Sequence, residues 1–115
     1  MSGANGPNDA EGIPFRVLLR MEIHPGMEHE FEQTWHRVGS AIVTHPANLG
    51  HWLSRGAEDK SVYYVVSDWV DEARFREFEK SEAHVKHREQ LHPYRSKGSM
   101  TTMRVIYGMT GAASR

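Results

Sequence analysis

The pentapeptide Asn48-Leu-Gly-His-Trp52 carries the side chains best suited to chemistry in this sequence. The Asn48 amide and the Trp52 indole both offer N–H donors, and the imidazole of His51 titrates close to neutral pH. A few polar groups of this kind at the mouth of an apolar cavity are typical of a small-molecule site. Taken alone, an asparagine such as Asn48 is more often a turn residue and a tryptophan such as Trp52 more often a packing residue, so this alternative stays open.

The eight histidines raise the question of a metal ion. His84 and His87 are three residues apart, so on a helix they share a face, and His51 could join them in a facial triad. Most of the histidines, however, fall in expected turns or at polar helix positions: His24, His29, His45, His87 and His92. No carboxylate has a compelling spacing to the triad. We therefore expect no native metal site.

Composition excludes several other classes of protein. There is no cysteine, so disulfides, thiolate zinc sites and cysteine nucleophiles are absent. Fourteen Lys and Arg against 15 Asp and Glu give a net charge of -1, which argues against nucleic acid as a partner. No glycine-rich phosphate motif or nucleophile elbow is present. Apolar runs are far shorter than the ~18 residues of a membrane span, and no signal-peptide pattern is visible, so we expect a cytoplasmic protein.

Hydrophobic spacing predicts the elements that would position these side chains. Apolar residues alternate from Phe15 to His24, which predicts a strand, and a stripe from Met27 to Ile42 predicts an amphipathic helix that ends near His45-Pro46. Later segments continue the pattern: strands at 51–55 and 61–69, a helix capped by Asp71 with Phe75 and Phe78 on one face, a second helical segment from Ser81 to Leu91, and a last strand at 100–109.

This order, β-α-β-β-α-β, predicts an α+β ferredoxin-like fold: a four-stranded antiparallel sheet with both helices on one face. The first and third strands carry apolar residues on both alternations, so the uncovered face also needs a partner. We expect a homodimer packed sheet to sheet, a dimeric α/β barrel. Residues 14–109 would form the domain, with flexible tails at 1–13 and 110–115.

Several motifs in this order resemble the antibiotic biosynthesis monooxygenase (ABM) family. They are the strand ending in Pro25-Gly26, the Asn48-x-x-x-Trp52 spacing, the strand closing in Ser67-Asp-Trp69, and the helical stretch from Asp71 through Phe78 to Ser81-Glu-Ala-His84. Within the family, the sequence is most similar to the small cofactor-independent anthrone oxygenases of aromatic polyketide pathways. The resemblance covers almost all of the chain from Phe15 to Met109.

The resemblance implies an enzyme that oxidises a polycyclic phenol of the anthrone type to a quinone with dioxygen, without metal, flavin or heme. Asn48 and Trp52 would hold the substrate oxygen, while His51, Tyr64 or an ordered water accepts the proton. We expect the substrate to lie against aromatic and methionine side chains, although such stripes also form ordinary core: Trp35, Phe31, Phe78, Trp69 and Met103.

Two alternatives remain beside the oxygenase. Heme-degrading relatives carry an Asn, a Trp and an axial His where this chain has Leu18-Leu19-Arg20 and Phe78 with Arg88, so heme degradation is disfavoured. A tyrosine that anthrone oxygenases carry shortly after the Trp is replaced here, because Glu58 stands near that place. A non-catalytic protein that binds an aromatic ligand, or assists a polyketide pathway, therefore stays open.

Overall fold

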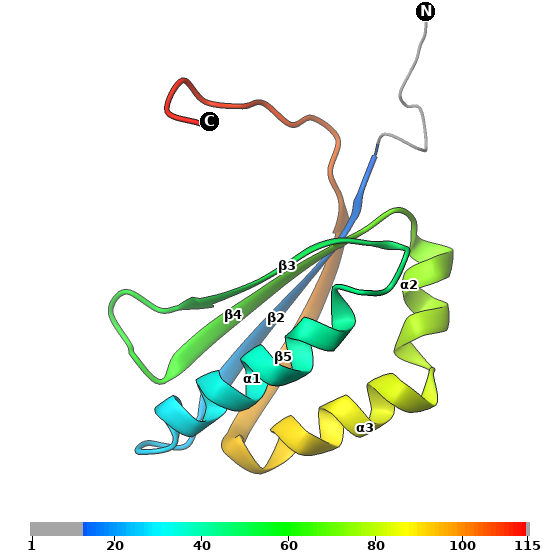
Figure 1. The fold of residues 1–115 in the computed structure, drawn as a ribbon. Helices are drawn as coiled ribbons and strands as arrows, with labels where there is room; N and C mark the ends of the chain where they lie inside the picture. Colours follow the sequence, from blue (N-terminus) through cyan, green and yellow to red (C-terminus); the bar gives the residue numbers. More distant parts are fainter. Residues whose placement is uncertain (1–12, 115) are drawn as a thin grey trace, which may run out of the picture.

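The structure, a computed structural model, describes residues 13–114 and consists of one sheet with helices on one face (Figure 1). The strands are β2 (Phe15–Ile23), β3 (Asn48–Arg55), β4 (Val62–Trp69) and β5 (Arg95–Arg104), all antiparallel in the order β3-β4-β2-β5. The helices are α1 (Glu28–Ile42), α2 (Glu72–Glu79) and α3 (Glu82–Leu91), followed by a 3-10 turn, η2 (His92–Tyr94). The predicted ferredoxin-like fold is confirmed.

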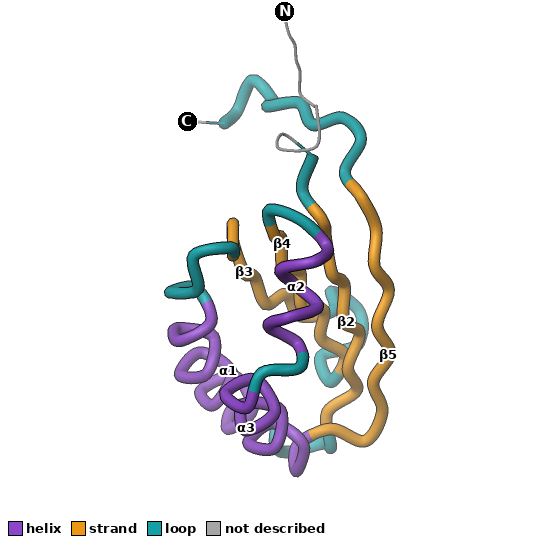
Figure 2. The backbone as a smooth tube through the Cα atoms, turned by 90° about the vertical axis from the view of Figure 1, so that its right-hand side faces the viewer, coloured by secondary structure: helices purple, strands orange, loops and turns teal. Residues whose placement is uncertain are grey.

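The helices lie on one side of the sheet and leave its other face open (Figure 2). On the helix-covered face, Val17 of β2 lies beside Ser67 of β4, and both side chains are buried. On the opposite, open face, Leu18 lies beside Val66, and both are only partly buried. Because successive side chains of a regular strand point to opposite faces, the odd-numbered residues of β2 and β4 face the helices and the even-numbered ones lie on the open face.

Two groups of buried side chains fill the space under the helices. One joins α1 and α2 to one end of the sheet: Phe15, Val17, Val38, Ile42, Ala47, Trp69, Phe75 and Phe78. The other lies toward the opposite end: Met21, Ile23, Phe31, Tyr63 and Val65. Large aromatic side chains dominate both groups, so most of the apolar burial that stabilises the fold is found here.

Three predicted boundaries are wrong. The last strand spans Arg95–Arg104 instead of 100–109, because β5 pairs with β2 only as far as Phe15, which lies opposite Arg104. Its first half is polar because an edge strand exposes most of its side chains. Strand β3 begins at Asn48 instead of His51, and α1 ends at Ile42, before His45.

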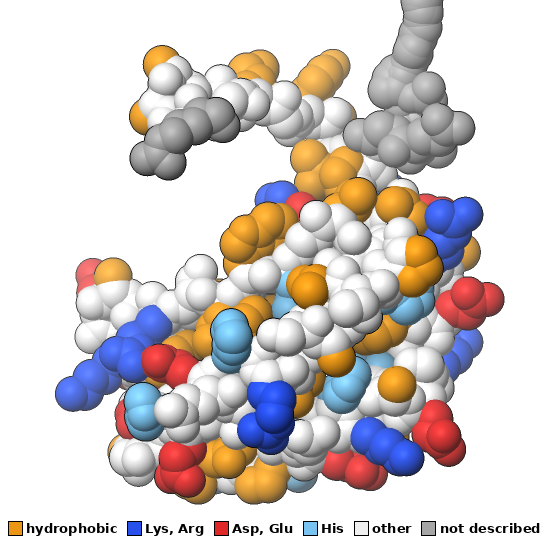
Figure 3. Space-filling model, viewed as in Figure 1, with side chains coloured by type: hydrophobic (Ala, Val, Ile, Leu, Met, Phe, Trp, Pro, Cys, Tyr) orange, Lys and Arg blue, Asp and Glu red, His pale blue; other side chains and the backbone are white. Residues whose placement is uncertain are grey.

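The expected tails are only partly visible. Residues 1–12 lie outside the described part of the chain. At the other end, Ile106, Tyr107 and Met109 precede the expected 110–115 tail. They were predicted to lie in the last strand, but they follow β5 with 76%, 85% and 93% of their surface exposed, and hydrophobic side chains stand out along this C-terminal segment (Figure 3). Within residues 13–114, no helix has the length and apolar character needed to span a bilayer.

Candidate active site

A cavity of about 290 Å³ lies between the helix-covered face of the sheet and the three helices. Its walls are mainly apolar, as is typical of sites for small organic molecules. The apolar walls include Val17, Leu19, Met21, Trp35, Val38, Ile42, Val65, Trp69, Phe75, Phe78, Leu91 and Met100. The polar lining residues are His51, Ser67, Glu79, His84, His87, Arg88, Arg95 and Ser99.

His51 projects from the helix-covered face of β3 and forms part of the cavity wall. Its ring stacks on Trp35, with centroids 4.7 Å apart and planes 15° from parallel. Gly39 of α1 permits this, since a Cβ there would stand 3.2 Å from Cδ2 of His51. Neither ring nitrogen has a hydrogen-bond partner among the described residues. Burial lowers the pKa of His51 from 6.5 to about 4, so the imidazole is neutral at pH 7.

His84 enters the cavity from the first turn of α3. Ser81 begins this helix, because its hydroxyl accepts a hydrogen bond from the His84 backbone N–H at 3.2 Å. The His84 ring packs against Phe78 with centroids 4.5 Å apart. Burial, with the positive charge of Arg88 nearby, lowers the pKa of His84 to about 4. The cavity therefore holds two neutral imidazoles.

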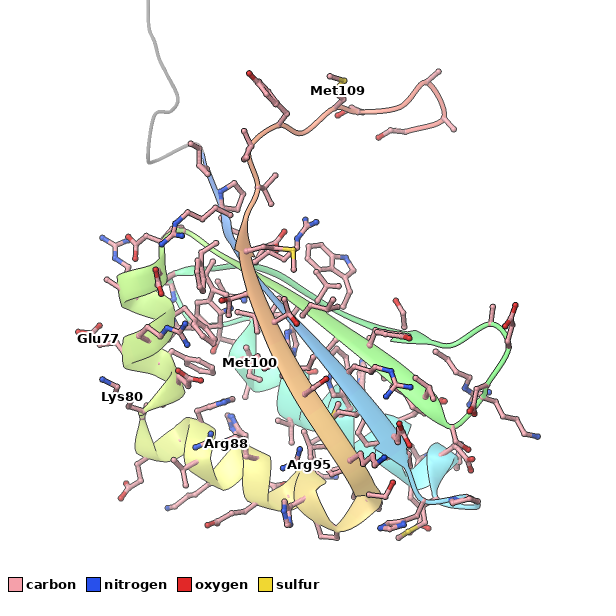
Figure 4. The ribbon with its side chains drawn as sticks, turned by 180° about the vertical axis from the view of Figure 1, so that it is seen from behind. Glu77, Lys80, Arg88, Arg95, Met100 and Met109 are labelled. Carbon is pink, nitrogen blue, oxygen red and sulfur yellow. The ribbon has the colours of Figure 1, made fainter. Side chains whose placement is uncertain are left out.

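Two arginines line the cavity. Figure 4 shows Arg88 of α3 and Arg95 of β5 in the region between α3 and the edge strand β5, where Met100 also lies. No carboxylate within residues 13–114 forms a salt bridge with either arginine. Gly98 gives the Arg95 guanidinium room to fold back, because a Cβ there would collide with it. An anionic group on a ligand would be attracted to these two lining arginines.

Asn48 is held by the sheet and does not line the cavity. Its side-chain nitrogen lies 3.3 Å from each of three acceptors, the carbonyl oxygens of Gly50 and Asp68 and the hydroxyl of Ser67, which share its two hydrogens. The register shifts between Asn48 and Gly50, so this amide bridges an irregular start of β3. Asn48 therefore reaches the cavity only through Ser67.

Besides Asn48, four of the nine expected site residues do not line the cavity. Trp52 and Tyr64 are on the open face, because they alternate with His51 and Tyr63 on the helix-covered face. Trp52 is 50% exposed. Met103 also lies on the open face, opposite Arg16. Phe31 is sealed in the core beside Tyr63. The predicted positions of these four side chains are corrected accordingly.

Of the other expected residues, Trp35, Phe78 and Trp69 line the cavity with His51, and their contact with substrate stays a prediction. Ser67 also lines the cavity, although it was not among the residues predicted from the sequence. A signal was present, since Ser67 interrupts the apolar alternation of Tyr63, Val65 and Trp69 on the covered face. Among the described residues, no group of three or more His, Asp or Glu side chains could hold a metal ion.

Residues 14–90 match the family described as antibiotic biosynthesis monooxygenase, ABM. The chain belongs to this family. Among solved structures, a variant of SnoaB from Streptomyces nogalater, described as a cofactor-independent oxygenase, superposes with a TM-score of 0.77 at 18% identity. The match covers 85% of this chain and 98% of that one. At this identity the likeness establishes a shared fold.

Two curated relatives of this ABM protein come from Streptomyces. The 42.8 kDa protein in the whiE locus of Streptomyces coelicolor is 26% identical over 75 residues, which is 65% of this chain and 19% of that protein. Protein SchA of Streptomyces halstedii is 24% identical over 84 residues, with 73% and 22% covered. The ABM chain therefore spans about a fifth of the length of these relatives.

Two of the three histidines that line the cavity, His51 and His84, lead to a prediction about the stability of this ABM protein. Each has a folded pKa of about 4, below its unfolded value of 6.5, so the folded state binds fewer protons between these values. Their contribution is complete above pH 6.5 and is lost as the pH falls toward 4, with a slope of up to about 1.4 kcal/mol per pH unit for each proton.

Urea unfolding between pH 7.5 and 5 measures this effect. The free energy of unfolding is expected to fall with pH in the wild type and to fall less in the His51→Phe, His84→Phe double variant. Glu28 and Glu32 have pKa values lowered from 4.5 by hydrogen bonds, chiefly from Ser61 and Tyr63, so their effect appears below this window. Equal slopes in both proteins would contradict the prediction.

Proposed function

We propose that the protein binds a polycyclic aromatic polyketide, a phenol of the anthrone type, in this cavity and oxidises it to a quinone with dioxygen and without a cofactor. The observation that carries the proposal is the neutral, unpartnered imidazole of His51 in the wall of an otherwise apolar cavity. A general base must be unprotonated and able to reach the acidic proton of its substrate. His51 meets the first condition at pH 7.

The reaction follows from the acidity of the anthrone itself. Its CH₂ carbon, flanked by phenolic rings, loses a proton to His51 and leaves a delocalised anion. The anion gives one electron to dioxygen, and the resulting radical and superoxide combine and take up a proton to form a hydroperoxide. Loss of water leaves one oxygen atom as the new carbonyl and the other in the water. The anion beside His51 also stabilises the imidazolium, which raises the pKa of His51 as the proton moves.

The remaining walls support the binding of a flat, acidic molecule. Trp35, Trp69 and Phe78 offer aromatic faces to a ring system. Arg88 and Arg95 in the cavity lining favour a substrate that carries or develops negative charge. A cavity with little water strengthens these electrostatic interactions.

Oxygen consumption with dithranol, a simple anthrone, tests the proposal. We expect saturable uptake of one dioxygen per quinone formed, and label from ¹⁸O₂ in the quinone carbonyl. The matched control is the same assay in the absence of protein, because dithranol also oxidises slowly in buffer. Uptake that the protein does not accelerate would remove the oxygenase assignment.

A second candidate function is non-catalytic binding of an aromatic ligand. It is favoured by the absence of any tyrosine among the described residues that line the cavity. The Tyr63 hydroxyl is bonded to Glu32 and Arg55, and Tyr64 lies on the open face. Saturable quenching of tryptophan fluorescence by 1,8-dihydroxyanthraquinone without dithranol turnover would select this alternative.

We also propose that the open face packs against a second copy of the chain. Leu18, Val66 and Trp52 lie side by side on β2, β4 and β3 and form an apolar row across the sheet. Next to this row, Arg16 pairs with Asp68 through two hydrogen bonds of 2.8 and 2.9 Å, so the charges there are balanced within one chain. A second sheet would bury this apolar row.

Placing a charge in this row is expected to separate the dimer. Val66→Glu would bury a carboxylate without a partner, which is costly at an apolar interface. Sedimentation velocity should give a dimer for the wild type and a monomer for Val66→Glu. Ala73→Glu puts the same charge on the exposed side of α2 and should remain dimeric. A monomeric wild type would contradict the proposal.

A further inference from the structure

Ser67 is a buried hydroxyl in a place where the sheet otherwise presents apolar side chains. It lies on β4 between Val65 and Trp69, is 6% exposed and lines the cavity. A buried hydroxyl is unfavourable unless its hydrogen-bonding capacity is used. The partners of Ser67 therefore indicate what the side chain does.

Both partners of Ser67 are donors. The indole Nε1 of Trp69 donates to the Ser67 oxygen at 2.9 Å, and the Nδ2 of Asn48 donates to it at 3.3 Å. An indole N–H cannot accept a hydrogen bond. The Asn48 amide is oriented by two further acceptors, the carbonyl oxygens of Gly50 and Asp68, so its nitrogen and not its oxygen faces Ser67.

These contacts leave the hydrogen of the Ser67 hydroxyl without an acceptor. A serine oxygen has two acceptor sites: the Trp69 N–H takes one, and the Asn48 amide, whose two hydrogens are shared with the two carbonyl oxygens, faces the other, so neither partner can accept the Ser67 hydrogen. The Ser67 hydrogen must then be donated in the remaining direction, and the described residues supply no acceptor for it. Because Ser67 lines the cavity, that acceptor would be a bound molecule. A hydroxyl that accepts two hydrogen bonds is also a stronger donor.

The neighbour of Ser67 on β3 is His51, which lies directly opposite it in the ladder. Ser67 offers a hydrogen-bond donor, and His51 offers two unpartnered ring nitrogens. A donor and a proton acceptor thus lie side by side on the covered face of the sheet. This arrangement can bind an oxygen atom while a proton leaves the same molecule.

We propose that the Ser67 hydroxyl donates a hydrogen bond to the substrate oxygen on which negative charge develops. Asn48 and Trp69 are positioning residues, since they occupy the acceptor sites of Ser67 and direct its hydrogen into the cavity. This inference rests on the proposed function for its catalytic consequence. The hydrogen bond from Ser67 would form with any phenol bound in the cavity, so it can be tested without turnover.

The first measurement is the ionisation of bound 1,8-dihydroxyanthraquinone, whose absorbance shifts to longer wavelength when a phenol group loses its proton. We expect the wild type to lower the pKa of the bound phenol, and Ser67→Ala to raise this pKa by about one to two units relative to the wild type. Ser67→Thr, which keeps the hydroxyl, should retain the wild-type value. Asn48→Ala should give an intermediate shift, because the hydroxyl is then free to turn.

The second measurement is dithranol oxidation. Ser67→Ala is expected to lower kcat about 10²–10³-fold, with a smaller change in KM. Thr34→Val is the matched control, because it removes another buried hydroxyl, one that bonds to the Tyr94 hydroxyl outside the cavity. Thr34→Val should change neither the pKa of the bound phenol nor kcat for dithranol. If Ser67→Ala does not fold, Ser67→Cys replaces the hydroxyl by a weak donor of similar shape.

The outcomes separate the two proposals. A Ser67-dependent shift in the bound phenol without oxygen uptake leaves the hydrogen bond established and removes the oxygenase function. An unchanged ionisation in folded Ser67→Ala overturns the hydrogen bond, whatever the activity. Equal shifts in Ser67→Thr and Ser67→Ala overturn it as well, because the shape of the side chain and not its hydroxyl would then matter.

Discussion

Replacing His51 by phenylalanine is expected to lower kcat for dithranol oxidation by about 10²–10⁴-fold, the usual contribution of a positioned general base. The phenylalanine ring keeps the stack on Trp35 and the approach of Gly39, so the cavity retains its shape. Only the ring nitrogens that could accept the proton are lost. We expect strongly reduced oxygen uptake together with an unchanged circular dichroism spectrum.

The pH profile separates loss of a base from loss of structure. In the wild type, kcat/KM should be level near neutral pH and fall as the pH approaches the His51 pKa of about 4, and this acid limb should be absent from the residual activity of His51→Phe. His29→Phe makes the same substitution at an exposed histidine of α1 and should behave as the wild type. A large loss in His84→Phe with full activity in His51→Phe would assign the base to His84 instead.

The sequence predicted the parts of the fold that depend on local patterns. Alternation over Phe15–Ile23 and the helical stripe from Phe31 to Ile42 are strong because one face of each element is buried. The capping residues Asp71 and Ser81 were found for a similar reason, since their side chains bond to backbone N–H groups only three residues away. Such signals need no knowledge of the rest of the chain.

The site was harder to predict because it depends on which face of a strand is covered. The Asn48-x-x-x-Trp52 spacing suggests two side chains on one face, since four residues is an even number. The irregularity between Asn48 and Gly50 breaks this relation, so Asn48 bonds to Ser67 while Trp52 lies on the open face. One shifted residue is enough to reverse a face.

The cavity itself arises from contacts between distant segments. Ser67 gains its role from donors that lie two residues away and across the sheet, at Trp69 and Asn48. His84 becomes a buried imidazole only because α3 packs beside Phe78. No periodicity in the sequence records these relations. The region of the site and His51 could therefore be predicted from the sequence, whereas the side chains beside His51 could be identified only from the structure.

Phe31→Ala is expected to lower the free energy of unfolding by about 3–5 kcal/mol, the usual cost of removing a large buried side chain. Phe31 is fully buried and packs edge to face on Tyr63, with ring centroids 4.9 Å apart. A domain of this size is typically stable by about 5–15 kcal/mol, so the substitution removes much of the total. Urea unfolding followed by circular dichroism gives the value, and Phe31→Leu should cost much less because it leaves a smaller cavity.

The same position decides whether Phe31 belongs to the core or to the substrate site. Its side chain does not line the cavity, whereas Trp35, one turn further along α1, does. We therefore expect Phe31→Leu to destabilise the protein without changing KM for dithranol, and Trp35→Leu to raise KM by removing an aromatic face from the cavity wall. A residue confined to the core affects the amount of folded protein and not its affinity for substrate. A rise in KM for Phe31→Leu as large as that for Trp35→Leu would therefore show that Phe31 contacts substrate, as the sequence suggested.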